Sequence, residues 1–126
     1  MDSKRILIID DDPTITTLVE GFLEDTGRFT VRAENDGKWG LAAAKEFQPD
    51  LVLLDVMMSE IDGGFIASQI KEDETLKGTP IVFLTSAVSK EQVEAKGGII
   101  GGNRFLAKPV DPDELIDCID QSIKDR

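Results

Sequence analysis

The chain has 126 residues, 40% of them hydrophobic and 31% charged, which suits one domain with its own core and is too short for two ordinary ones. A net charge of −11 argues against direct binding of nucleic acid through its phosphates. The chain has one cysteine, Cys118, which excludes an internal disulfide, and no histidine, which excludes imidazole catalysis and imidazole metal sites. No apolar run approaches the roughly 20 residues of a membrane helix, and no signal-peptide pattern is present, so we expect a cytoplasmic protein without membrane contact.

The first predicted elements deliver carboxylates to the end of a strand. Residues 5–9 form a short apolar run typical of a buried strand, and Asp10, Asp11 and Asp12 follow it directly. Asp12 is a good N-cap and Pro13 a good first residue for the helix that follows. Asp10 and Asp11 have no comparable structural role, and two adjacent carboxylates repel each other unless a cation is bound.

A second strand and helix follow with a weaker pattern. Residues 29–33 alternate between apolar and polar, which predicts a less buried strand, and residues 41–47 carry the apolar spacing of a helix. Trp39 lies beside this apolar stripe. We interpret it first as a half-buried packing residue, with a partner contact as the alternative.

The third strand is the element around which the chain is organised. Residues 51–54 are continuously apolar, as in a strand buried on both faces of a parallel sheet, and they run straight into Asp55. Asp55 therefore lies at the carboxyl edge of the sheet, where ligands bind in open α/β folds. The alternative is that Asp55 begins a turn or caps the next helix.

The last strands add a hydroxyl and an amine. Residues 81–84 predict a strand ending at Thr85, and residues 105–107 predict one ending at Lys108. Between them, the glycine-rich run 97–102 lacks the lysine-serine ending of a phosphate-binding P-loop, so we interpret it as a helix end and a flexible connection. Cys118 lies near the apolar stripe of the last helix and is expected to fill the core.

Five strands alternating with five helices predict an α/β fold with a five-stranded doubly wound parallel sheet, in a single domain over residues 1–126. Right-handed crossovers bring all strand ends to one edge. That edge would carry three carboxylates, a hydroxyl and an amine: Asp10, Asp11, Asp55, Thr85 and Lys108. Such a site calls for an oxygen-bound cation, for which Mg²⁺ is the natural choice.

These residues also carry a resemblance. The matching stretches share order and spacing with the receiver domain of bacterial two-component response regulators, and they are Ile8-Ile9-Asp10-Asp11-Asp12-Pro13, Leu53-Leu54-Asp55 through Asp62-Gly63, Leu84-Thr85-Ser86 and Phe105-Leu106-Ala107-Lys108-Pro109. The chain resembles this family from end to end, in its single-domain, CheY-like form. The resemblance implies the flavodoxin-like, CheY-like variant of the doubly wound fold.

The resemblance implies a role for each site residue. Asp55 would accept a phosphoryl group from a phosphohistidine. Asp11, Asp55 and the backbone carbonyl of Met57 would bind Mg²⁺ directly, and Asp10 would act through a water molecule. The cation would offset the carboxylate repulsion and shield the incoming phosphoryl oxygens.

The resemblance also implies a switch. Lys108 would pair with Asp55 and then with the phosphoryl group, and Thr85 would move to donate a hydrogen bond to it. Phe105 would turn inward into the space that Thr85 vacates. The conformational equilibrium of the face formed by the fourth helix, fifth strand and fifth helix would then shift.

The implied function is a phosphorylation-driven interaction switch in a two-component phosphorelay, which is no enzyme beyond its own phosphorylation and dephosphorylation. The implied partners are a sensor histidine kinase or phosphotransfer protein, a downstream protein target, and a second copy of the chain in a phosphorylation-dependent dimer. We expect a stand-alone receiver without an output domain. Three features depart from the family. Ser59 replaces the usual proline, and the run 97–102 replaces a more ordinary helix ending. Phe105 has no hydroxyl, so it cannot make the hydrogen bond that a tyrosine would make.

Three other functions share this topology. A Mg²⁺-dependent phosphohydrolase would use Asp55 as nucleophile, but it commonly needs a carboxylate where this chain has Met57. A flavin-binding domain needs a phosphate-binding loop where the aspartates at positions 10–12 would repel phosphate. A receiver that is never phosphorylated is a third alternative, against which the intact acidic set argues. Because neither Met57 nor Ala87 can orient a water well beside Asp55, we also predict slow self-dephosphorylation.

Overall fold

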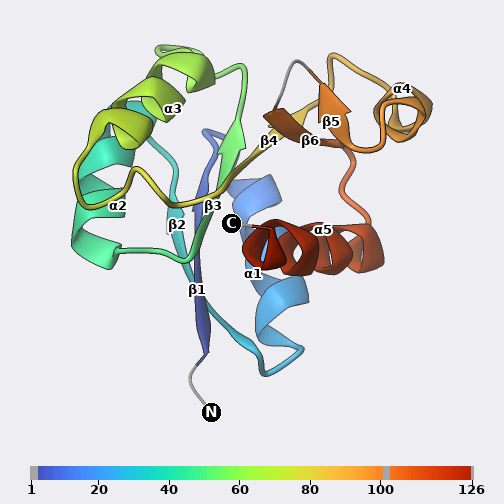
Figure 1. Ribbon diagram of the computed structural model, residues 1–126, viewed down its shortest axis with the longest axis horizontal. Helices are drawn as coiled ribbons and strands as arrows, with labels where there is room; N and C mark the ends of the chain where they lie inside the picture. Colours follow the sequence, from blue (N-terminus) through green and yellow to red (C-terminus); the bar gives the residue numbers. More distant parts are fainter. Residues whose placement is uncertain (1–2, 101–102, 126) are drawn as a thin grey trace.

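The computed structural model describes residues 3–100 and 103–125 (Figure 1), and its sheet has the strand order β2-β1-β3-β4-β6-β5. The strands are β1 Lys4–Ile9, β2 Phe29–Glu34, β3 Leu51–Asp55, β4 Ile81–Thr85, β5 Ile99–Ile100 and β6 Asn103–Ala107. The helices are α1 Pro13–Glu24, the 3₁₀ turn η1 Gly37–Trp39, α2 Gly40–Phe47, α3 Gly63–Glu72, α4 Lys90–Ala95 and α5 Pro112–Lys124. The predicted doubly wound α/β fold is confirmed: β2, β1, β3, β4 and β6 are parallel, and only the short β5 is antiparallel to its neighbour.

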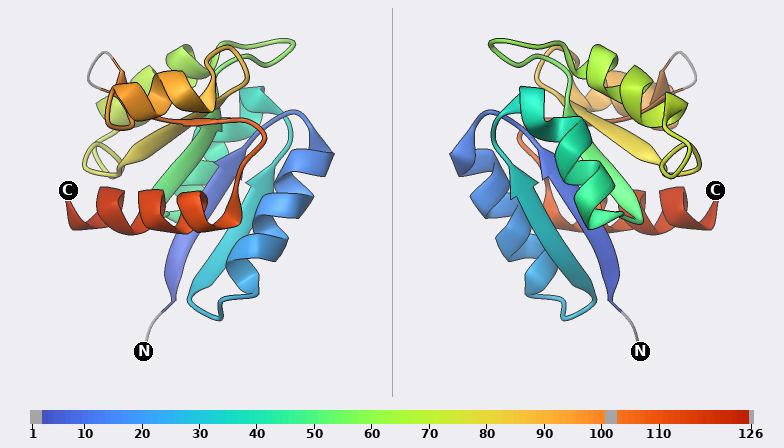
Figure 2. Two further views of the ribbon diagram at one scale, coloured as in Figure 1. Left: turned by 90° about the vertical axis from the view of Figure 1, so that its right-hand side faces the viewer. Right: turned by 90° about the vertical axis from the view of Figure 1, so that its left-hand side faces the viewer.

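Two layers of helices cover the sheet, with α1 and α5 on one face and α2 and α3 on the other (Figure 2). Side chains of β1 alternate between the layers, so Ile6 and Ile8 join one core cluster while Leu7 and Ile9 join the other. β3 is buried along its whole length for the same reason. Each fully buried aliphatic side chain of this kind contributes roughly 1.5–3 kcal/mol. The two cores therefore fix the sheet, and with it the places where the strands end.

Helix starts follow the capping residues of the sequence. Asp12, Asp62 and Asp111 each accept a hydrogen bond from a backbone N–H in the first turn of α1, α3 and α5. Ser89 and Gln92 form a reciprocal capping box at the start of α4. These caps fix where each of these helices begins after the strand that precedes it.

The glycine-rich segment is where the structure differs from expectation. Gly97 and Gly98 end α4 with positive φ angles of 65° and 82°, and the Gly98 N–H donates to the carbonyl of Val93 at 2.9 Å, as expected of a helix end. The prediction of a flexible connection is wrong for Ile99–Ile100, which form β5 and make the sheet six-stranded. β-Branched residues favour strands, and β6 offers them a free edge for pairing. Gly101 and Gly102 lie outside the described residues.

Two single residues can be compared with their predictions. The side chain of Trp39 is 56% exposed at the end of η1, so it is more exposed than the half-buried packing residue we first favoured. Cys118 is partly buried against the core between α1, α5 and the sheet, which confirms it as a core filler. Burial raises the pKa of its thiol. Among the described residues, no helix is long and apolar enough to cross a membrane.

Candidate functional site

The ends of β1 and β3 bring three carboxylates together. These strands are neighbours in the sheet, with Ile9 opposite Leu54, so the aspartates that follow them lie side by side. One carboxylate oxygen from each of Asp10, Asp11 and Asp55 lies within 4.8 Å of the others. Because 44 residues separate Asp11 from Asp55, this cluster is a product of the fold rather than of local sequence.

Asp10 is the innermost of the three and is completely buried. Its carboxylate accepts hydrogen bonds from the Asp12 backbone N–H at 3.0 Å and from the Lys108 amine at 2.8 Å. The side-chain amide of Asn35 donates to the Asp10 carbonyl at 2.9 Å and to the Thr16 hydroxyl at 3.0 Å. Sequence reasoning missed Asn35, because an asparagine before Asp-Gly signals only a turn.

Asp11 is exposed, and the loop after β3 contacts it. The backbone N–H of Ser59 donates to the Asp11 carboxylate at 2.9 Å. A proline at position 59 has no N–H and could not make this bond. The departure from the family at Ser59 therefore adds a tie between the loop and the acidic cluster.

Asp55 ends β3 and is 5% exposed. Burial raises its pKa above the ordinary value, the negative charge of Asp10 raises it further, and Lys108 partly opposes both. The Lys108 amine donates to Asp55 at 3.3 Å. The ionised Asp55 is thus destabilised where it stands, and a bound cation would relieve this.

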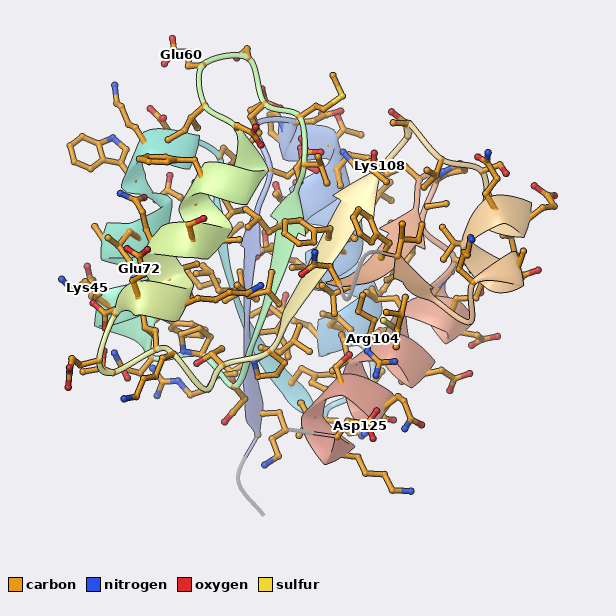
Figure 3. All side chains as sticks on the ribbon, turned by 45° about the horizontal axis from the view of Figure 1, so that its top comes forward. Lys45, Glu60, Glu72, Arg104, Lys108 and Asp125 are labelled. Atoms are coloured by element: carbon orange, nitrogen blue, oxygen red, sulfur yellow. The ribbon has the colours of Figure 1, made fainter. Side chains whose placement is uncertain are left out.

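Lys108 reaches the cluster from the end of β6. Its backbone N–H donates to the carbonyl of Thr85 at 2.8 Å, which extends the β4–β6 ladder by one residue and directs the side chain to the same edge. Burial of the amine lowers the pKa of Lys108, but hydrogen bonds and charge from Asp10 and Asp55 outweigh it, so the pKa is raised overall. The amine is therefore a firmly held positive charge (Figure 3).

Thr85 and Phe105 stand on the strands beside this amine. Thr85 is buried, and its hydroxyl accepts a hydrogen bond from the Ala87 N–H at 3.0 Å. Among the described residues it makes no hydrogen bond to the carboxylates. Phe105 is half-buried and stacks on Phe83, with ring centroids 5.2 Å apart. Phe83 and Phe105 are directly opposite in the β4–β6 register, so they share the sheet face that packs against α3.

Gly63 is a supporting residue that sequence reasoning noted only as part of a turn. A Cβ on Gly63 would lie 2.1 Å from the backbone carbonyl oxygen of Asp55, which is far inside van der Waals contact. Its N–H donates to the carbonyl of Val56 at 2.9 Å. α3 can begin against the end of β3 only because this position has no side chain. The adjacent pair Gly63-Gly64 was the available signal.

The donor set fits a hard divalent cation. Three carboxylates face one amine, so the cluster carries excess negative charge, and every donor on offer is oxygen. The Met57 side chain is 72% exposed, and Met57 is paired with Asp62 in an isolated bridge, so position 57 can offer only its backbone. Asp10, Asp11 and Asp55 are therefore the residues whose side chains could hold Mg²⁺ together. The Met57 carbonyl stays a prediction.

Comparison with known proteins agrees with this arrangement. Residues 6–120 match the model of the response regulator receiver domain family. The chain is 39% identical over 112 residues to the DNA-binding dual master transcriptional regulator RpaA of Synechocystis, which covers 89% of the chain but only 46% of the relative. It is 34% identical to protein PilH of Pseudomonas aeruginosa, covering 91% of the chain and 93% of that protein.

One solved structure bears on the metal. The receiver domain of the sensor histidine kinase PA1611 from Pseudomonas aeruginosa, with a magnesium ion coordinated in its active-site cleft, superposes with a TM-score of 0.81. It is 26% identical and covers 98% of this chain and 99% of that one. The chain spans about half the length of some curated relatives, such as RpaA, and nearly all of others, such as PilH.

Proposed function

The chain belongs to the response regulator receiver domain family, a phosphoacceptor module of two-component signalling, and on that premise we propose that Asp55 is its phosphoacceptor. The observation that supports this assignment most directly is the position of Asp55. It lies at the end of a fully buried strand, within 4.8 Å of two further carboxylates and in hydrogen-bond contact with a lysine. Burial and the negative charge of Asp10 raise its pKa, so its ionised form gains from a positive partner.

The phosphoryl transfer is a displacement at phosphorus. An oxygen of Asp55 forms the new bond to phosphorus while the bond from phosphorus to the histidine nitrogen of the partner breaks, and the freed imidazole takes up a proton. Mg²⁺, when bound, offsets the charge of the carboxylates and of the phosphoryl oxygens. Asp11, Asp55 and the Met57 carbonyl are its proposed direct ligands, with Asp10 beside them.

Lys108 and Thr85 complete the site in this proposal. The Lys108 amine already contacts Asp55, so once Asp55 carries the phosphoryl group as an acyl phosphate the amine can pair with a phosphoryl oxygen. The Thr85 hydroxyl accepts from Ala87 and keeps its own proton for donation. Thr85 and Phe105 lie on the same face of the sheet, so movement of Thr85 would leave space beside Phe105. We propose that Phe105 turns into this space and so links the site to the surface of α4, β6 and α5.

The partners follow from the same proposal. We propose a sensor histidine kinase or phosphotransfer protein as the donor, a protein target that reads the switched face, and a phosphorylation-dependent dimer as a further assembly. The cytoplasmic location and the stand-alone organisation stay predictions.

Intact-mass measurement tests the assignment. Wild type, Asp55→Asn and Glu60→Gln are incubated with a small acyl-phosphate donor, with and without Mg²⁺. Glu60 is an exposed carboxylate in the loop beside the site and serves as the matched control (Figure 3). One phosphoryl group on wild type and on Glu60→Gln, only with Mg²⁺, and none on Asp55→Asn is the expected result.

The same samples separate the switch from a hydrolase. Steady release of inorganic phosphate without an adduct would favour a phosphohydrolase, and an adduct on Asp55→Asn would overturn the assignment of the acceptor.

A further inference from the structure

The strands that carry Thr85 and Lys108 begin at a cleft on the opposite edge of the sheet. This cleft has a volume of about 480 Å³ and lies between the end of α3, the loop before β4, the β5–β6 pair and the end of α5. Figure 3 shows Lys108 near one end of the sheet and Arg104 with Asp125 towards the other. The volume is within the range of roughly 300–1,000 Å³ that small-molecule sites occupy.

The segment after β4 supplies one wall of the cleft. α4 has only six residues and ends at Gly97 and Gly98, whose positive φ angles turn the chain into β5. Ile99 of β5 then forms one wall of the cleft and is 44% exposed. The apolar side of the cleft is continued by Pro80 and Ile81.

The polar side of the cleft is positively charged on a strongly acidic chain. Lys71, Lys77 and Arg104 come from three separate segments, and among the described residues Asp125 alone adds a carboxylate to the lining of the cleft. The three positive charges and the single negative charge of Asp125 leave an excess of positive charge in the cleft. The whole chain, by contrast, has a net charge of −11. An anion entering here meets local attraction despite the net charge, since exposed charges beyond about 10 Å are screened at ordinary salt.

These three cationic side chains make few hydrogen bonds and salt bridges with the described residues. Neither Lys71 nor Lys77 takes part in a salt bridge with any residue that the structure describes, and Lys71 makes only a 3.3 Å hydrogen bond to the Asn103 side chain. The Arg104 side chain is only 21% exposed, yet a single bond of its guanidinium, to Asp125 at 2.8 Å, is made to a described residue. A guanidinium has five N–H donors, so most of its hydrogen-bonding capacity is left for a ligand.

We propose that this cleft binds a small organic phosphate: an anionic group held by Lys71, Lys77 and Arg104, and an apolar or planar body resting on Pro80, Ile81 and Ile99. A phosphate has several oxygens that accept hydrogen bonds. An arginine can donate to two of them at once through parallel N–H groups, and a lysine can donate to another through its ammonium. Because one wall of the cleft is apolar, the proposed ligand needs an apolar or planar group in addition to its phosphate. A mononucleotide has both parts and a size that suits the cleft. The site is independent of the acidic cluster, from which it is separated by the length of β4 and β6.

Titration of the ¹⁵N-labelled protein followed by amide chemical shifts tests this. The probes are AMP, adenosine and inorganic phosphate, all without Mg²⁺ so that the acidic edge does not recruit them. We expect AMP to shift the amides of residues 77–79, 81 and 103–104 in a saturable way. Adenosine and inorganic phosphate should each bind at least about tenfold more weakly, because each lacks one half of the ligand.

Variants locate the binding. Lys71→Ala/Lys77→Ala should weaken AMP binding by about tenfold or more, since it removes two of the three cationic donors that hold the phosphate. Lys45→Ala is the control, because Lys45 is also an exposed lysine and pairs with Asp73 outside the cleft. It should bind AMP as wild type does.

Three results of the AMP titrations would overturn the proposal. They are an absence of saturable shifts with AMP, equal affinity for AMP and adenosine, and unchanged AMP affinity in the double variant. Saturation of the same amides by a glutamate-rich peptide but not by AMP would assign the cleft to an acidic protein partner and would also reject it. Mass measurement of phosphorylation on the double variant shows separately that the acidic edge is intact.

Discussion

The amine of Lys108 lies 2.8 Å from the carboxylate of Asp10, although 98 residues separate them in sequence. Asp10 is fully buried and the Lys108 side chain is 17% exposed, and the same amine also contacts Asp55 at 3.3 Å. One positive charge therefore serves two buried carboxylates, with Asp11 close by. The local excess of negative charge is the property from which the stability of the site and its need for a cation both follow.

Loss of the amine should destabilise the protein and make its stability depend on metal. Lys108→Ala leaves two buried carboxylates without their cation, and breaking a buried pair in this way costs roughly 3–5 kcal/mol. Chemical unfolding of the variant without Mg²⁺ measures this loss. Saturating Mg²⁺ should recover part of it in Lys108→Ala and should add less to wild type. Equal gains from Mg²⁺ in both proteins would contradict the account.

Neutralising Asp55 should stabilise the protein when no metal is present. Because burial and Asp10 raise the pKa of folded Asp55, the native state binds its proton more tightly than the unfolded state does. Asp55 therefore favours the fold below its ordinary pKa of 3.8, and this contribution is lost as pH rises through the raised pKa. Asp55→Asn removes the dependence, and near neutral pH its Tm should exceed that of wild type by a few degrees.

The pH series provides the control for Asp55→Asn. The difference in Tm between the variant and wild type should grow as pH rises from about 4 to about 7 in the presence of a chelator. A difference that is constant over this range, or that favours wild type at neutral pH, would show that the carboxylate is not destabilised where it stands.

A side chain at position 63 should disrupt the site. In Gly63→Ala the new Cβ would meet the Asp55 carbonyl oxygen at 2.1 Å, so α3 or the end of β3 must shift. We expect a loss of about 3 kcal/mol or more in the free energy of unfolding, together with weaker Mg²⁺ binding. Gly21→Ala is the control, because Gly21 lies in α1 with nothing near its missing Cβ. That substitution should stabilise by about 0.5–1 kcal/mol.

The acyl phosphate on Asp55 should be lost slowly. The exposed Met57 and the methyl group of Ala87 offer no polar side chain that could orient an attacking water. Decay of the phosphorylated mass over time in Mg²⁺ checks this, and complete loss within seconds without a phosphatase would contradict it. Met57→Asn should speed the loss by about tenfold or more, because it adds a group that can hold a water, while Met57→Leu should leave the rate unchanged.

The fold and the gathering of the site were accessible from sequence because both depend on strong local patterns. The continuous apolar runs before Asp10 and Asp55 identify strands buried on both faces, and parallel order brings their ends together. The supporting contacts were not accessible. The Asn35 bond to Asp10, the Ser59 N–H on Asp11 and the close approach at Gly63 depend on how loops cross between strands, which periodicity does not encode.

The segment after β4 was the least predictable part of the chain. Glycines at positions 97 and 98 correctly marked a helix end, but the pairing of Ile99–Ile100 with β6 is a tertiary choice made by an available sheet edge. The exposure of Trp39 also depends on the local fold and not on the apolar pattern. Its place beside an apolar stripe suggested burial, whereas η1 sets it on the surface, where the Lys38 amine lies 5.7 Å from its ring.

Crystals grown with Mn²⁺ in place of Mg²⁺ test the central claim most directly, because anomalous scattering locates the ion without reference to any expected position. The account predicts one ion at the carboxyl edge, within roughly 2.0–2.3 Å of an oxygen from Asp11, from Asp55 and from the Met57 carbonyl. An ion bound elsewhere, or an empty acidic edge at saturating metal, would contradict it.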